Sequence, residues 1–141
     1  MFNIIKRKAM KKILVSIVMM FLLTSCATIT KFPVSNVVPS ADITAKIKKD
    51  KQNNFEITII ANYLASAERL SPPKKMYVVW FVNKENGVNN SGQLKNENAK
   101  KNTLKTLSSF EPLEIFITAE DEGTVTYPTG IEISRAALIR N

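Results

Sequence analysis

The chain has no histidine at all and only one cysteine, Cys26, among its 141 residues. Without histidine it cannot build His-based metal sites, nor the Ser-His and Cys-His pairs that activate a nucleophile in many hydrolases. A single cysteine likewise excludes a disulfide framework within the chain. We therefore expect a protein that is not an enzyme, with no catalytic residue, no metal and no cofactor.

The sequence also lacks an apolar run long enough to span a membrane. Its longest such run, residues 13–23, is broken only by Ser16 and has about 11 residues, against the ~20 of a membrane-spanning helix. Small residues follow the run, and five basic residues precede it: Lys6, Arg7, Lys8, Lys11 and Lys12. This order predicts a secretory signal peptide over residues 1–25, and translation from Met10 would still leave a working signal.

The signal ends in Leu23-Thr24-Ser25-Cys26, which resembles the lipobox of bacterial lipoprotein signal peptides. The resemblance implies removal of residues 1–25 and lipid attachment at Cys26, with diacylglycerol on the sulfur and a third acyl chain, such as palmitate, on the amine. Two or more acyl chains anchor a protein stably. Ala27 stands where an aspartate would resemble an inner-membrane retention signal, so we expect the outer membrane in a Gram-negative cell. Residues 28–32 hold no acidic cluster of the kind that resembles a surface-export signal, which favours its periplasmic face. The alternative is an unmodified thiol in a membrane anchor.

Much of the positive charge belongs to this signal. The chain carries 20 basic and 12 acidic residues, but the part from Cys26 onwards has 15 against 12. Its lysines cluster near residues 46–51, 74–75 and 100–101 without forming a stripe, and solvated strand edges account for them. We therefore expect no nucleic-acid partner.

The remaining chain divides into a tether and one β domain. Residues 26–41 contain two prolines and no apolar period, which predicts a lipidated tether. Over residues 42–141, short segments alternate between apolar and polar side chains, which predicts antiparallel strands at 42–49, 55–64, 76–82, 92–95, 102–107, 113–118 and 131–136. About seven strands favour an all-β, immunoglobulin-like antiparallel β-sandwich, in which Trp80 takes the place of the buried core tryptophan.

Four short motifs of this domain resemble the extracytoplasmic C-terminal domain of anti-sigma-K factors and related small envelope lipoproteins. They are Tyr77-Val78-Val79-Trp80-Phe81-Val82, Gly92-Gln93-Leu94, Ile117-Thr118-Ala119-Glu120 and Pro128-Thr129-Gly130. The resemblance implies a shared β-sandwich. The sigma-binding region and transmembrane helix of those factors have no counterpart in this sequence, so we expect no sigma-factor partner.

Two groups of side chains suggest ligand binding. Glu120, Asp121 and Glu122 are consecutive, and clustered carboxylates can hold Ca²⁺. Neighbouring side chains of an extended backbone point apart, however, so a solvated hairpin end is the simpler explanation. Three aromatic residues, Tyr63, Tyr77 and Trp80, suggest a glycan platform. Packing in the hydrophobic core is the alternative, and it explains them more simply.

These observations favour a non-enzymatic, lipid-anchored cell-envelope protein that serves as a structural or accessory interaction module. Its expected partners are the membrane, through the acyl chains on Cys26, and an unknown envelope protein. The alternative is a ligand-binding module for calcium or glycan.

Overall fold

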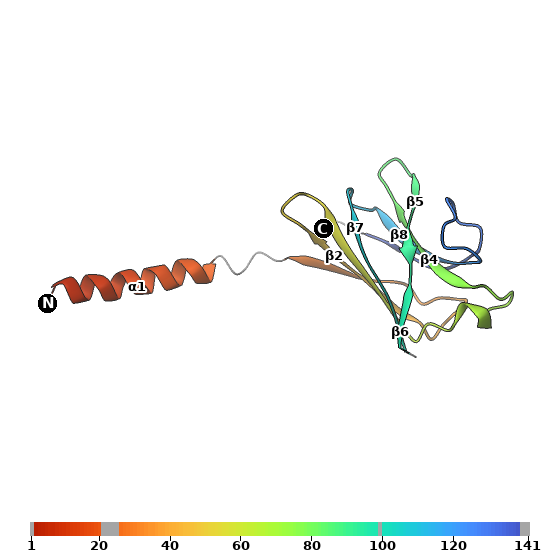
Figure 1. The fold of residues 1–141 in the computed structure, drawn as a ribbon, viewed down its shortest axis with the longest axis horizontal. Coiled ribbons are helices and arrows are strands. Elements are labelled where there is room, and N and C mark those ends of the chain that lie inside the picture. The colour runs from red at the N-terminus through yellow and green to blue at the C-terminus, as the bar shows by residue number, and fades with distance from the viewer. Residues whose placement is uncertain (1, 21–25, 99, 139–141) are drawn as a thin grey trace.

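The computed structural model describes residues 2–20, 26–98 and 100–138 (Figure 1). A helix, α1, covers Phe2–Met20, and no helix in the described ranges is long and apolar enough to cross a membrane. The described residues after Cys26 form strands and one short 3-10 turn, η1 (Ala67–Arg69). The strands are β1 (Ala27–Lys31), β2 (Asp42–Lys49), β3 (Phe55–Asn62), β4 (Met76–Val82), β5 (Val88–Gln93), β6 (Lys95–Asn98), β7 (Lys101–Ser108), β8 (Glu114–Glu120) and β9 (Ile131–Ala137).

These strands form two antiparallel sheets, in the orders β1-β2-β3-β7-β6 and β5-β4-β8-β9. With β1 set aside, the orders correspond to the ABED and C′CFG sheets of an immunoglobulin fold, with β2 as strand A and β9 as strand G. The predicted all-β sandwich is therefore confirmed, with nine strands in the described residues in place of about seven. Six of the predicted strands match β2, β3, β4, β7, β8 and β9, each end within two residues.

Alternation along the strands decides which side chains enter the core. β2 buries Ile43, Ala45 and Ile47, and β3 buries Ile57 and Ile59, with polar residues between them. Successive side chains of a strand point to opposite faces, so this sheet has one apolar and one polar face. β4 and β8 instead bury residues on both faces. Their sheet must therefore be covered on its outer side as well.

Strand β1 lies in the segment that the sequence predicts as a tether. It pairs with β2 so that Ala27 faces Lys48 and Lys31 faces Thr44. Its threonine and isoleucine residues favour an extended backbone. Five residues with a single isoleucine, however, give too weak a pattern to stand out beside two prolines. The predicted boundary at residue 42 is therefore wrong, because the folded domain begins at Ala27, directly after Cys26.

The rest of the predicted tether also packs into the domain. Phe32 and Val38 are each only 4% exposed and belong to the main core. Ser35 Oγ accepts a hydrogen bond from the Val38 N–H at 3.0 Å, which fixes the turn between them. The Ser134 hydroxyl of β9 donates to the Pro33 carbonyl at 2.8 Å. This segment therefore joins the edges of the two sheets.

The segment between β4 and β7 also differs from the sequence prediction. The sequence predicts a loop over residues 83–91 and one short strand over 92–95, whereas the structure has two strands, β5 and β6. The turn ends at Gly87, where the carbonyl accepts the Asn83 N–H, and β5 follows at once. The chain then crosses at Leu94 to the other sheet, where it forms β6. β5 is rich in asparagine, which is depleted in strands, so pairing with β4 rather than local propensity sets its conformation.

These contacts predict that residues 26–141 fold without the signal, whereas residues 42–141 are markedly less stable. Burial of one Phe or Val side chain contributes about 1.5–3 kcal/mol, so loss of Phe32 and Val38 should cost at least ~3 kcal/mol. A domain of this size has only ~5–15 kcal/mol in total. Urea denaturation of both fragments, followed by far-UV circular dichroism, measures the difference. Equal midpoints for two β-type spectra would contradict the place of residues 27–41 in the core.

Candidate functional site

The predicted lipid attachment site, Cys26, is exposed and its thiol is free. It directly precedes Ala27, which pairs with Lys48 near the end of β2. Cys26 therefore lies at the end of the sandwich where β2 turns into β3. The other lipobox residues, 23–25, lie outside the described residues.

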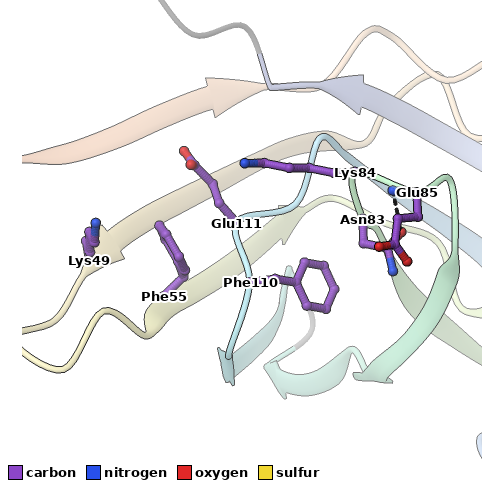
Figure 2. A pocket seen from close by; sticks show the side chains of 7 residues that line it. All are labelled: Lys49, Phe55, Asn83, Lys84, Glu85, Phe110 and Glu111. Atoms are coloured by element: carbon purple, nitrogen blue, oxygen red, sulfur yellow. Dashed lines mark hydrogen bonds between the residues drawn. The ribbon is translucent and has the colours of Figure 1, made fainter.

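A cleft of about 550 Å³ opens at the same end of the sandwich (Figure 2). The Lys49 ammonium lies 5.8 Å from the centroid of the Phe55 ring, and Asn83 Oδ1 accepts hydrogen bonds from the N–H groups of Glu85 and Gly87. The cleft is lined by residues in or beside the β2–β3, β4–β5 and β7–β8 connections: Lys49, Phe55, Asn83, Lys84, Glu85, Phe110 and Glu111. Two lysines are thus balanced by two glutamates, which leaves the cleft without a net charge to attract an ion.

Glu120, predicted to belong to a solvated hairpin end, is fully buried as the last residue of β8. Its Oε1 accepts hydrogen bonds from the Thr118 hydroxyl at 2.6 Å and from the N–H groups of Thr129 and Gly130 at 3.0 and 3.1 Å. Its Oε2 accepts the Thr129 hydroxyl at 2.6 Å. The prediction is wrong for this residue, because the carboxylate ties the loop of residues 121–130 back to β8.

Calcium binding by the three consecutive carboxylates would therefore lack the Glu120 oxygens. Ca²⁺ takes six to eight oxygen ligands, but the Glu120 carboxylate is occupied by four internal hydrogen bonds. Asp121 forms an ion pair with Lys74 at 2.9 Å, and Glu122 is exposed. Among the described residues, no three histidine, cysteine, aspartate or glutamate side chains are placed to hold a metal ion. The three consecutive carboxylates therefore do not share one centre.

Glu120 keeps its charge although it is buried. Desolvation raises its pKa, but the hydrogen bonds from Thr118, Thr129 and Gly130 together outweigh it, so the pKa lies below its ordinary value. Hydrogen bonds to a charged group contribute about 1.5–3 kcal/mol each. The carboxylate is thus held by fixed donors and by no ion pair with another described residue.

The hydrogen-bonded chain continues from Glu120 to Trp80. The indole Nε1 donates to Thr118 Oγ1 at 2.8 Å, and the Thr118 hydroxyl in turn donates to Glu120 Oε1. Both Trp80 and Thr118 are buried. The buried polar side-chain atoms of the described residues all have hydrogen-bond partners, as native cores require.

Trp80 is buried as predicted, but it is not between the two sheets. It lies in a second apolar cluster with Val78, Val82 and Phe116, whereas its neighbours Val79 and Phe81 belong to the main core. In immunoglobulin domains the tryptophan of this strand packs against the inter-sheet disulfide. The expected position is therefore wrong, because alternation along β4 turns Trp80 to the outer face.

Four residues in register form a row across this outer face: Asn90, Trp80, Phe116 and Arg135. The Trp80 and Phe116 rings are stacked with their centroids 6.1 Å apart. The Arg135 guanidinium lies 3.9 Å from the centroid of the Phe116 ring, and it also pairs with Glu132 at 2.8 Å. Stacked rings contribute about 0.5–1.5 kcal/mol beyond their buried area, so the row stiffens the sheet from edge to edge.

The loop of residues 121–130 covers the Asn90 and Trp80 end of this row and lies beside β4 and β5 in Figure 1, where it is blue. The Asn90 side-chain amide donates to the carbonyls of Gly123 and Val125 at 2.9 and 2.8 Å. Val125 packs against the cluster around Trp80. These two contacts, together with the Lys74–Asp121 ion pair, hold the first half of the loop.

Gly130 fixes the other end of the loop. A Cβ atom there would lie 1.6 Å from the carbonyl oxygen of Ala119, so any other residue would push the backbone away from β8. Glycine alone lets the Gly130 N–H approach the Glu120 carboxylate. The Pro128-Thr129-Gly130 motif of the sequence thus serves the buried carboxylate.

The aromatic residues considered as a glycan platform are separated in space. Tyr77 and Trp80 are buried, which confirms core packing for both. The Tyr77 hydroxyl donates to the Ala65 carbonyl at 2.7 Å, and burial raises its pKa to about 12. Tyr63 is 59% exposed, because β3 ends one residue before it and its φ of 55° turns the chain. One exposed ring does not make a platform.

Six of the lysines, which form no stripe in the sequence, lie on the outer face of the five-stranded sheet. Alternation places Lys46 and Lys48 on it, and the register sets Lys46 beside Thr58, which is beside Lys105. We call this surface the lysine face, after Lys31, Lys46, Lys48, Lys95, Lys101 and Lys105. Sequence reasoning found the pair on β2 but missed the surface, because the order of β1, β7 and β6 in the sheet was unknown.

Among the residues that the structure describes, three carboxylates share this face. They lie within 3.5 Å of a lysine ammonium, in the pairs Lys31–Asp42, Lys101–Glu97 and Lys105–Glu56. Outside this face, the chain from Cys26 onwards carries nine basic and nine acidic residues. The whole surplus of three positive charges therefore belongs to the lysine face.

Replacement of the buried carboxylate should reduce the pH dependence of stability. Because the native pKa of Glu120 lies below the ~4.3 of an unfolded glutamate, its contribution is present above that pH and is lost as pH falls through the native pKa. We expect Glu120→Gln to lower the free energy of unfolding by about 2 kcal/mol at pH 7 and the gap to narrow in acid. Urea denaturation at several pH values measures this difference in the free energy of unfolding. Glu122→Gln is the control, because that side chain is exposed and its replacement should change the free energy by less than ~0.5 kcal/mol. A gap independent of pH would contradict this role.

Asn90→Ala should loosen the loop over Trp80. Trp80 is the only tryptophan, so the fluorescence of the parent protein is expected to be blue-shifted and weakly quenched by iodide. Without the Asn90 amide, the carbonyls of Gly123 and Val125 lose their donor, and quenching should rise. Asn89→Ala is the matched control, since that amide reaches only the Gly87 carbonyl at 3.4 Å. Equal quenching in both variants would show that Asn90 does not hold the loop.

Comparison with known proteins gives no match: no family model, curated protein or solved structure is significantly similar to this chain. The likeness of the four short motifs to anti-sigma-K factors therefore stays a prediction, as does the lipobox.

Proposed function

We propose that this chain is a non-enzymatic, lipid-anchored protein of the bacterial cell envelope, whose β-sandwich is a structural or accessory interaction module. The observation that carries the proposal is the position of Cys26. The only thiol of the chain follows the signal-like segment and is exposed immediately before the first strand. An acyl chain on this sulfur would meet no buried part of the domain.

The distribution of polar groups supports a non-enzymatic role. The most strongly buried carboxylate, Glu120, has its acceptors filled by Thr118, Thr129 and Gly130, and it is covered by the loop of residues 121–130. A general acid or base must instead reach a substrate proton. The cleft near Cys26 is lined by turn residues whose charges balance. Both features support a domain that acts through contacts on its surface and not through an active site.

The position of Cys26 also sets the reach of such a module. No flexible segment separates it from Ala27, the first residue of β1. The longest strands have eight residues, which extend about 26 Å at ~3.3 Å per residue. We therefore propose that the partner is another envelope component close to the membrane surface, rather than one that crosses the periplasm.

The anchor is tested by fatty-acid labelling of the full chain in cells. We expect Cys26→Ser to abolish labelling and to stall removal of residues 1–25, because thioether acylation needs the sulfur. Ser25→Ala is the matched control, since it keeps a small residue before the cysteine and should retain label. Mass spectrometry of the N-terminal peptide identifies the acyl chains. Label that persists in Cys26→Ser would overturn the proposal.

A further inference from the structure

We infer that the lysine face binds the anionic headgroups of the phospholipid leaflet that holds the anchor; this inference rests on the proposed attachment at Cys26. The lysine face is the outer surface of the five-stranded sheet, and β1 is one of its edge strands. Cys26 directly precedes that strand. The anchor and the positive surface therefore belong to the same side of the domain.

The charges of this face are available to an external anion. Asp42, Glu56 and Glu97 each pair with one lysine, whereas Lys46 and Lys48 form no ion pair with any described residue. Lys95 is likewise exposed without an ion pair in the described part of the chain. Exposed ion pairs are weak and screened by salt, so the paired lysines also contribute to the surface potential. Anionic headgroups are the complementary charge at a membrane surface.

Exposed aliphatic side chains on the same face favour a membrane over another polyanion. Ile29 is 70% exposed beside Lys46, and Leu107 is 67% exposed beside Glu56. A surface that combines lysines with aliphatic side chains matches the boundary between headgroups and acyl chains. Single-stranded nucleic acid would instead be met by aromatic residues, and the described residues place none on this face.

The anchor makes weak binding by this face sufficient. Acyl chains on Cys26 would hold the sheet at the bilayer, which turns contact with the headgroups into an intramolecular event at high effective concentration. One lysine near an anionic surface changes the binding equilibrium by about fivefold, so two or three unpaired lysines are enough to bias the orientation. The opposite sheet, with the loop of residues 121–130, would then point away from the bilayer.

Lysine acetylation of the mature lipidated protein in vesicles tests this orientation. The protein is purified from membranes and inserted into vesicles of phosphatidylglycerol and phosphatidylcholine, or of phosphatidylcholine alone. We expect acetylation of Lys46, Lys48 and Lys95 to be about fivefold slower in the anionic vesicles only. Lys75 precedes β4 at the end of the sandwich opposite Cys26, and it should react equally in both. Sodium chloride at 1 M, with a Debye length of about 3 Å, should remove the protection.

Paired variants identify the residues responsible. Lys46→Gln with Lys48→Gln should remove the protection of Lys95. Lys74→Gln with Lys75→Gln, which removes the same charge at the opposite end of the sandwich, should keep it. Equal acetylation in the two kinds of vesicle would overturn the inference, and so would protection by a DNA oligonucleotide without protection by anionic vesicles.

The same spectra separate this inference from the proposed anchor. They report the mass of the N-terminal peptide, so an acylated Cys26 with no protected lysines overturns only the lysine-face inference. An N-terminal peptide without acyl chains overturns the proposed anchor instead. In that case the same protein is sedimented with the anionic vesicles. Salt-sensitive binding that Lys46→Gln with Lys48→Gln weakens would support the face, and no binding would overturn it.

Discussion

The carboxylate of Glu120 is the contact on which the outer layer of this domain depends. Thr118, Thr129 and Gly130 all direct donors at it, and Trp80 is oriented through Thr118. Loss of the acceptor would leave these buried donors unpaired, at about 1–3 kcal/mol each. One charged group thus joins β4, β8 and the loop before β9. Its hydrogen bonds hold this loop, residues 121–130, as a third layer over the outer face of β4 and β8.

This third layer bears on how a small sandwich with one cysteine stays folded. Antibody domains reinforce the space between their sheets with a disulfide and a tryptophan. Here the main core is mostly aliphatic, and the tryptophan has moved to the outer face, where it packs with Phe116 and Val125. Both faces of β4 and β8 are consequently buried. Added apolar area, at ~25 cal/mol per Å², takes the place of a covalent cross-link.

The sequence predicts the elements whose information is local. Residues 42–49 and 76–82 match β2 and β4 because alternation and β-branched residues act within each strand. β1 and β5 escape prediction because their partners in the sheet determine them. The burial of Glu120 depends on donors nine and ten residues later, and three consecutive acidic residues otherwise indicate a solvated loop. The lysine face depends on the strand order, which no local pattern contains.

The place of β1 changes what an anchor at Cys26 would do. A flexible tether of 15 residues would span roughly 20 Å and let any face of the sandwich meet the membrane. A strand that begins at Ala27 removes that freedom, because its hydrogen bonds to β2 fix the anchored residue at one edge of one sheet. Rotation about this edge is then the main freedom left, and the charge surplus of the lysine face biases it. The proposed orientation therefore follows from the hydrogen bonds of a five-residue strand as much as from charge.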